Sequence, residues 1–188
     1  MLIRWSALRI GAPWILPLAL LACDDGGGEP ERVPDAAVEA DLGWGAPDDV
    51  LKADTLAEEL ADHTAWTELT EGYVQGFGAL HASWQRIFQN GDDAGAAGYI
   101  IVKRSYDTPD EDALAQISVM KRIPGYAPDQ GDWFFAAFEP SFELATDGNS
   151  RPLAGRIARG SNEGCVPCHD GAPGGDFLFS VDAADPYP

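Results

Sequence analysis

The pattern of apolar and polar positions in the middle of the chain predicts four β-strands. The strand-like runs cover residues 81–89, 98–106, 114–123 and 133–138, and Gly, Pro, Asp or Asn bounds each of them. The intervening segments, at 91–93, 107–110 and 124–132, are short and polar. Connections of this length join neighbouring antiparallel strands, so the pattern indicates an antiparallel meander.

A helical pattern precedes these strands. Pro47 and the acids that follow it suit the first turn of a helix. The helix should run to about Asp62 with an apolar face made of Val50, Ala53, Ala57 and Leu60. A second, short helix is expected within residues 151–169. The predicted fold class is α+β, with an antiparallel sheet of about four to five strands, an N-terminal helix and a short C-terminal helix.

The first residues have the features of a secretion signal. Arg4 and Arg9 precede an apolar run at 10–21, which is too short and wrongly flanked for a membrane span. The sequence Leu20-Leu21-Ala22-Cys23 resembles the lipobox of bacterial lipoproteins, in which the cysteine becomes the lipidated first residue. Ordinary cleavage that leaves Cys23 free is the alternative. Both interpretations place the mature protein outside the cytoplasm.

The remaining chain divides into a tether and one domain. Residues 1–22 form the predicted signal peptide, and residues 23–43 are rich in Gly, Pro and acids, which is typical of a flexible tether. Residues 44–188 form the predicted domain. Removal of the signal leaves about 165 residues, enough for one domain with a hydrophobic core. The aromatic content of 10%, with six Trp, favours a packed interior.

The chain is strongly acidic. Its formal net charge is −19, and loss of Arg4 and Arg9 with the signal makes the mature chain more negative still. Such a surface repels nucleic acid and anionic lipid, so neither is an expected partner. Membrane attachment is expected through the lipid on Cys23 alone, in the bacterial cell envelope and facing the periplasm.

The strongest chemical signal is Cys165-Val166-Pro167-Cys168-His169. C-x-x-C-H is the attachment sequence for c-type haem, so one covalent haem c is expected. The thiols of Cys165 and Cys168 bond the porphyrin, and His169 becomes an axial ligand of the iron. The second ring nitrogen of His169 is expected to donate to a backbone carbonyl. The alternative is half of a zinc site, which needs about two more ligands, and His63 and His81 are not in paired spacing.

An ordered series of motifs surrounds this attachment sequence between about residues 66 and 179. The series comprises Ile101-Val102-Lys103, Ser118-Val119-Met120-Lys121, Gly125-Tyr126, Gly131-Asp132-Trp133-Phe134, the haem motif and Asp176-Phe177-Leu178-Phe179. In this order the motifs resemble the family of cytochrome P-460 and cytochrome c-prime-beta. The resemblance implies a mostly β-sheet protein that holds a single haem against its sheet.

Lys103 is the next candidate residue. Period-two alternation puts it on the strand face of Tyr99 and Ile101, where an unpartnered lysine is costly. In the family that the sequence resembles, a lysine of the matching strand is covalently joined to the haem ring. The resemblance therefore implies a haem cross-link at Lys103. The alternative is a lysine on an exposed strand edge that extends past its neighbours into water.

The second axial position of the iron decides the function. A sixth protein ligand makes an electron carrier, whereas an open position allows small molecules to bind. The candidate ligands are His63, His81 and Met120. Ordinary roles at a helix end, at a strand start and in the core are the alternatives for these three residues.

The residues expected near the second axial position of the iron do not decide between oxidation and binding of a small molecule. Family members active on hydroxylamine carry a distal carboxylate, but the comparable strand here offers Gln116, which cannot take up a proton at neutral pH. An acid from a loop, such as Glu71 or Asp112, is a second source. The related nitric oxide-binding proteins have an apolar cap, for which this chain offers Phe134, Phe135 and Phe138, unless these pack in the core.

Three arginines precede the haem motif: Arg151, Arg156 and Arg159. Guanidinium groups pair well with haem propionates. Solvated positions on a helix face are the alternative.

The resemblance implies a haem-dependent oxidoreductase that acts on hydroxylamine or nitric oxide, or a protein that binds nitric oxide. Two alternatives stay open: a periplasmic electron-transfer cytochrome with six-coordinate haem, and a non-catalytic haem gas sensor. The expected partners are a small molecule at the iron and a redox partner protein. A homodimer is left open.

Overall fold

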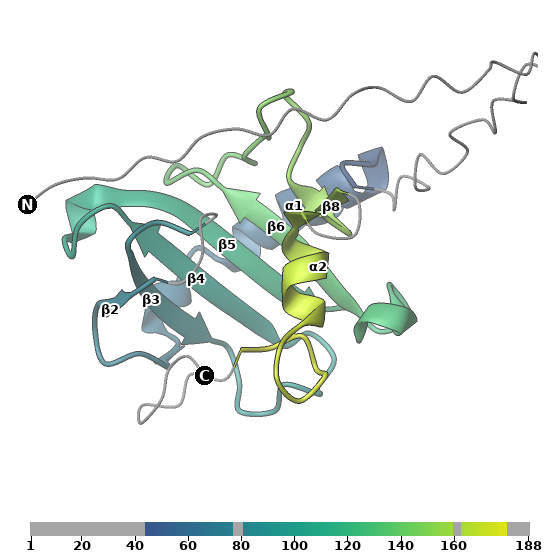
Figure 1. The fold of residues 1–188 in the computed structure, drawn as a ribbon, viewed down its shortest axis with the longest axis horizontal. Helices are drawn as coiled ribbons and strands as arrows, with labels where there is room; N and C mark the ends of the chain where they lie inside the picture. The colour runs from purple at the N-terminus through teal and green to yellow at the C-terminus, as the bar shows by residue number, and fades with distance from the viewer. Residues whose placement is uncertain (1–43, 77–80, 160–162, 180–188) are drawn as a thin grey trace, which may run out of the picture. The chain divides into compact units, whose positions relative to one another are not determined.

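The structure is a computed structural model that describes residues 44–76, 81–159 and 163–179. All of these residues belong to one compact unit (Figure 1). The predicted signal peptide at 1–22, the predicted tether at 23–43 and Cys23 lie outside the described residues.

A seven-stranded antiparallel sheet forms the centre of the fold. The strands follow the order β1-β3-β4-β5-β6-β7, and β2 also pairs with β3. Their bounds are β1 Thr67–Glu68, β2 Val74–Gln75, β3 Trp84–Gln89, β4 Ile100–Tyr106, β5 Leu114–Arg122, β6 Trp133–Phe138 and β7 Ala154–Gly155. The α+β class is confirmed.

The predicted number of four to five strands is wrong. The four long strands, β3 to β6, fall within the four predicted runs, and β6 has the predicted bounds. The strands missed, β1, β2 and β7, are two residues long. So short a segment shows no periodicity, and pairing with a longer neighbour is what makes it a strand.

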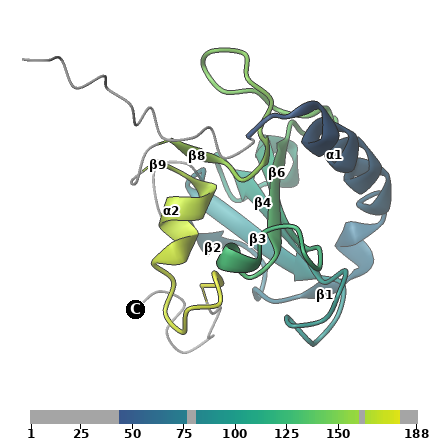
Figure 2. The same ribbon diagram turned by 90° about the vertical axis from the view of Figure 1, so that its right-hand side faces the viewer.

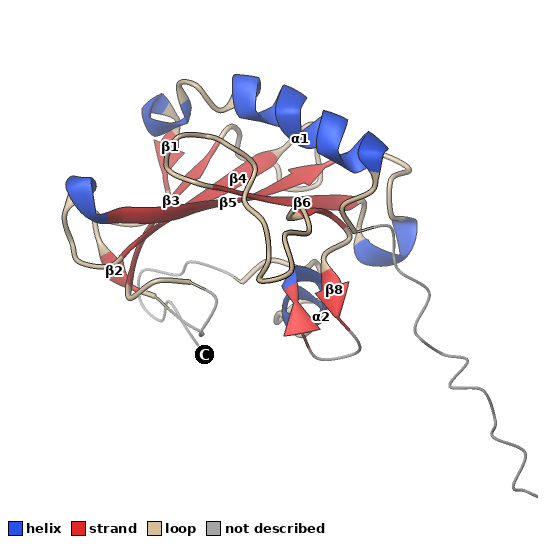
Figure 3. Cartoon of the chain, turned by 90° about the horizontal axis from the view of Figure 1, so that it is seen from above, coloured by secondary structure: helices blue, strands red, loops and turns tan. Residues whose placement is uncertain are grey.

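Helix α1, Pro47–Glu59, covers one face of the sheet (Figure 3). It starts at the predicted proline and ends three residues before Asp62, and a 3₁₀ turn at His63–Ala65 follows. Ala53 and Leu56 pack with Leu60 against strand residues that include Phe88 and Val102. These side chains form the α1-face core.

A different group of elements covers the opposite face (Figure 2). It contains α2, Cys165–Asp170, the two-stranded sheet of β8, Ala158–Arg159, and β9, Glu163–Gly164, and the segment 171–179. The buried side chains here, the α2-face core, are Trp44, Tyr99, Met120, Trp133, Phe135, Ile157, Val166 and Phe177. Two short 3₁₀ helices, Glu111–Ala113 and Pro128–Gln130, precede β5 and β6. Among the described residues, no helix has the length and apolar character that a membrane crossing requires.

Gly164 sets the start of α2. Its φ is +109°, and an added Cβ would lie 2.6 Å from the carbonyl oxygen of Ile157. A side chain at this position would therefore both strain the backbone and collide with a neighbouring segment. The contact continues at Val166, whose N–H donates to the same oxygen at 3.0 Å.

We predict that Leu56→Ala destabilises the protein by about 2–5 kcal/mol, because it opens a cavity between α1 and the sheet. Leu51→Ala is the matched control on the same helix, since Leu51 is 63% exposed, and it should change stability by less than about 0.5 kcal/mol. Urea unfolding of both variants measures the difference. Equal midpoints would contradict the assignment of the α1-face core.

Candidate functional site

The C-x-x-C-H residues lie on α2, on the side of the sheet opposite α1. Cys165 is half-buried beside the α2-face core and Cys168 is exposed, and both are free thiols. Burial raises the pKa of Cys165 to about 12, so this thiol is protonated at neutral pH. Neither sulfur is engaged in a disulfide, so both are available for thioether bonds.

His169 is held in one tautomer. Its Nδ1 lies 2.7 Å from the carbonyl oxygen of Phe177, and because a carbonyl only accepts, Nδ1 must donate. This is the backbone partner that the sequence led us to expect. Burial lowers the pKa of His169 to about 4, so the ring is neutral at pH 7 and Nε2 carries a lone pair. A neutral imidazole with this orientation is the form that ligates a metal.

Two aromatic rings flank this imidazole. The ring centroid of Phe135 lies 5.5 Å from that of His169, and Phe179 contacts it at 5.4 Å. Phe135 belongs to β6, and Phe179 ends the described part of the C-terminal segment. The histidine is therefore packed between the sheet and the tail of the domain.

Lys103 lies on β4, the strand between β3 and β5, and not at a sheet edge. Alternation with Ile101, which packs against the α2-face core, directs it to the same face as the motif. Burial lowers its pKa, and the nearby thiols of Cys168 and Cys165 act in the opposite direction. The fold thus brings this lysine close to cysteines that are more than sixty positions away in the sequence.

His81 completes the group of basic side chains. Burial lowers its pKa to about 3, and the charges of Lys103 and His169 contribute in the same direction. Its Nδ1 is buried and has no hydrogen-bond partner. Of the proposed sixth ligands, His81 is the one that the fold places beside both Lys103 and His169.

The other two candidate ligands, Met120 and His63, lie on opposite sides of the sheet. Met120 is buried in the α2-face core, on the correct side of the sheet. His63 packs against Phe88 and Phe142 on the α1 side, and its Nδ1 donates to the carbonyl of Leu60 at 2.7 Å. The sheet lies between His63 and α2, so His63 is excluded as an iron ligand.

Sequence reasoning missed Ser105, which forms a polar row beside Lys103 together with Gln116 and Ser118. Ser105 is fully buried, and its Oγ has no hydrogen-bond partner. Gln116 pairs with it across β4 and β5, and the hydroxyl of Ser118 donates to the Gln116 side chain at 3.4 Å. Buried polar atoms without partners are uncommon and indicate a place for a bound group or water. The signal in the sequence was that Ser105 lies two positions after Lys103, so both side chains are expected on the same face of the strand.

Core packing, the alternative to an apolar cap, is confirmed for the three phenylalanines, and Phe135 alone packs on the α2 side. Phe135 lies in the α2-face core, whereas Phe134 and Phe138 lie in the α1-face core. Side chains alternate along β6, so neighbouring phenylalanines point to opposite faces. Trp133, two positions before Phe135, is the other aromatic residue of β6 on the α2 side.

The remaining candidates have other surroundings. Glu71 and Asp112, the loop acids, are exposed. Arg156 forms an ion pair with Asp129 at 2.7 Å, and Arg151 stacks on Trp44 with its guanidinium carbon 4.4 Å from the ring centre. The side chain of Arg159 lies outside the described residues.

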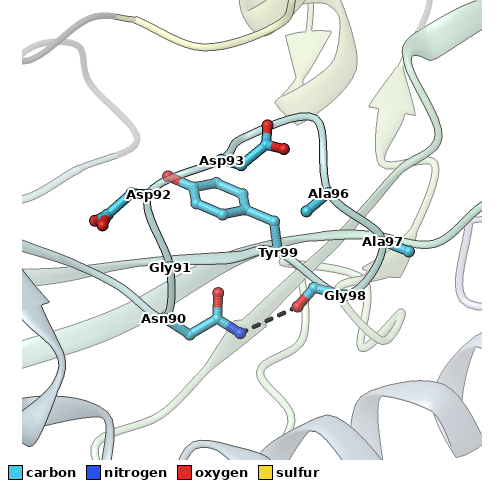
Figure 4. Close-up of a pocket in the computed structure, with 8 residues that line it drawn as sticks. All are labelled: Asn90, Gly91, Asp92, Asp93, Ala96, Ala97, Gly98 and Tyr99. Carbon is cyan, nitrogen blue, oxygen red and sulfur yellow. Dashed lines mark hydrogen bonds between the residues drawn. The ribbon is translucent and has the colours of Figure 1, made fainter.

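A depression of about 240 Å³ lies at the loop that connects β3 to β4 (Figure 4). Its lining comes from one loop: Asn90, Gly91, Asp92, Asp93, Ala96, Ala97, Gly98 and Tyr99. The Asn90 amide closes this loop by donating to the Gly98 carbonyl at 3.0 Å. The depression is a feature of that loop and contains none of the predicted site residues.

A haem fits the donor set on the α2 face. Two free thiols, a neutral histidine with an oriented Nδ1–H and unpartnered polar atoms at His81 and Ser105 meet there. No group of three or more His, Cys, Asp or Glu side chains in the described ranges is arranged to hold a metal ion. Haem needs only one such ligand from the protein, because the porphyrin supplies four nitrogens. No protein-family model matches the sequence, and no match was found among curated proteins.

Proposed function

We propose that the chain is an exported mono-haem c-type protein of the cytochrome P-460 type. Cys165 and Cys168 would hold the haem, and His169 would bind the iron. The observation that carries the proposal is the neutral imidazole of His169, whose Nδ1–H is held by the Phe177 carbonyl next to two free thiols. A haem attached here supplies a redox-active iron that binds small nitrogen compounds.

The residues around His169 orient and shield it. The hydrogen bond to Phe177 fixes the plane of the imidazole and raises its basicity as a ligand. Phe135 and Phe179 pack against the ring and limit its rotation. A half-buried proximal ligand held in one orientation suits an iron that binds or oxidises small molecules.

The reaction class follows from the family resemblance. The proposed activity is oxidation of hydroxylamine or nitric oxide, or binding of nitric oxide at an open iron position. Gln116 lies on the same face of β5 as the site. Family members active on hydroxylamine have a carboxylate in the comparable strand, which accepts a proton, whereas Gln116 does not. A non-catalytic sensor would bind the small molecule without converting it. Steady-state assays with hydroxylamine distinguish such a sensor from an enzyme.

The cellular setting belongs to the same proposal. Lipid on Cys23 would tether the domain to the envelope with the haem facing the periplasm, where c-type haem is attached in bacteria. The strongly acidic chain repels anionic surfaces, so a redox partner would present basic groups.

Produced in a bacterium able to mature c-type cytochromes, the protein should be coloured and carry the mass of one haem. Cys165→Ser combined with Cys168→Ser should abolish the covalent haem, because no thioether bond can form. Cys23→Ser is the matched control and should keep the haem while losing the lipid mass. Intact mass spectrometry and visible absorption measure both properties. A colourless wild-type protein without added mass would refute the proposed function.

Lys103 is proposed to modify the haem, through the cross-link that the resemblance implies. Lys103→Met should shift the visible absorption bands, because the side chain no longer bonds or contacts the ring. Lys121→Met is the control, since Lys121 pairs with Glu59 of α1, and its spectrum should match the wild type. If Lys103→Met leaves the bands unchanged, Lys103 has no part in the mechanism.

A second candidate function, an electron carrier, is favoured by one observation, the buried Nδ1 of His81, which has no hydrogen-bond partner. In that case His81 would be the sixth ligand, the haem would be low-spin, and nitric oxide would not bind.

We expect instead a high-spin spectrum and nitric oxide binding in both the wild type and His81→Ala. Absorption spectra with and without nitric oxide measure this, with Met120→Leu as the parallel test of the other candidate ligand on that face. A low-spin wild type that becomes high-spin only in His81→Ala would establish the electron carrier.

A further inference from the structure

Two motifs that lie far apart in the sequence meet behind His169. The Nε1–H of Trp133, in Gly131-Asp132-Trp133, donates to the carbonyl of Asp176 at 2.9 Å. The next carbonyl along the chain, that of Phe177, accepts the Nδ1–H of His169 at 2.7 Å. One peptide unit therefore separates the indole hydrogen bond from the histidine hydrogen bond.

The backbone that carries these carbonyls is strained. Phe177 has a φ of +67°, a left-handed conformation that is uncommon for residues other than glycine. Such a conformation persists only when surrounding contacts enforce it. Two contacts do so here: the carboxylate of Asp176 accepts the N–H of Leu178 at 3.1 Å, and Trp133 binds the carbonyl of Asp176.

Trp133 is itself fixed from several sides. Its side chain is fully buried, and the guanidinium carbon of Arg122 lies 4.2 Å from the centre of its ring. Arg122 is anchored in turn, because it donates to the carbonyls of Ala94 and Gly131. Gly131 has a φ of +62°, and an added Cβ there would lie 3.3 Å from the indole. These contacts hold the indole in the orientation that donates to the Asp176 carbonyl.

We propose that Trp133 is a positioning residue for the proximal histidine. Its hydrogen bond holds the Asp176–Phe177 peptide so that the Phe177 carbonyl stays in line with Nδ1 of His169. Trp133 thereby sets the orientation and basicity of the iron ligand without touching the iron. This inference rests on the proposed function, because it concerns His169 as a haem ligand.

The test is Trp133→Phe, which keeps an aromatic ring in the core and removes the donor. The haem should remain attached, because both cysteines are intact. The iron–histidine stretching band of the reduced protein should move to lower frequency, and the reduction potential should become more positive, because a less basic imidazole stabilises the oxidised iron less. Resonance Raman spectroscopy and a redox titration measure these shifts.

Trp44→Phe is the matched control. Trp44 is a buried indole of the same core with an arginine stacked on it, but it does not bind the Asp176 carbonyl. This variant should lose stability like Trp133→Phe and keep the wild-type band and potential. A general loosening of the core would shift both variants alike and would overturn the proposal.

A second variant serves if Trp133→Phe does not fold. Asp176 is exposed, so Asp176→Ala should fold while it frees the N–H of Leu178. It should shift the band in the same direction and by less. Haem-bearing variants with unchanged bands would overturn the positioning role and leave the proposed function intact. A wild type without haem would refute the proposed function and this inference together.

Discussion

Strict alternation of side chains across a sheet covered on both faces is the constraint on which the rest of this structure depends. Val102 and Lys103 are neighbours in the sequence, yet one lies in the apolar core beneath α1 and the other faces α2. The same alternation divides Phe134 from Phe135. Each strand thus contributes half of its side chains to stability and the other half to the site.

Burial on the α2 face controls the protonation of the site. His81, His169 and Lys103 all have pKa values lowered chiefly by burial, and the charge of Lys103 lowers the pKa of both histidines further. The chain as a whole is strongly acidic, so this basic group is distinctive within it. Neutral imidazoles and a lysine of weakened basicity are the forms that can ligate a metal or react with a cofactor.

The residues that carry the family resemblance have a common physical purpose in this fold. Gly131 leaves room for the indole of Trp133, and Gly164 lets α2 begin against the Ile157 carbonyl. The C-terminal Asp176 and Phe177 then connect the indole to His169. Residues spread over more than forty positions therefore converge on a single imidazole.

The sequence by itself determined the local features. Pro47 and the acids after it marked the start of α1, the long strands β3 to β6 were evident from their composition and bounding residues, and a short helix, α2, was expected around the C-x-x-C-H residues. The tertiary structure alone decided the two-residue strands, the exclusion of His63, the choice among the phenylalanines, and the burial of Ser105 and of the His81 Nδ1 atom. The reason is physical. Local signals depend on the preferences of neighbouring residues, whereas the face on which a residue lies, and the atoms it meets there, depend on strand register and on segments distant in the chain.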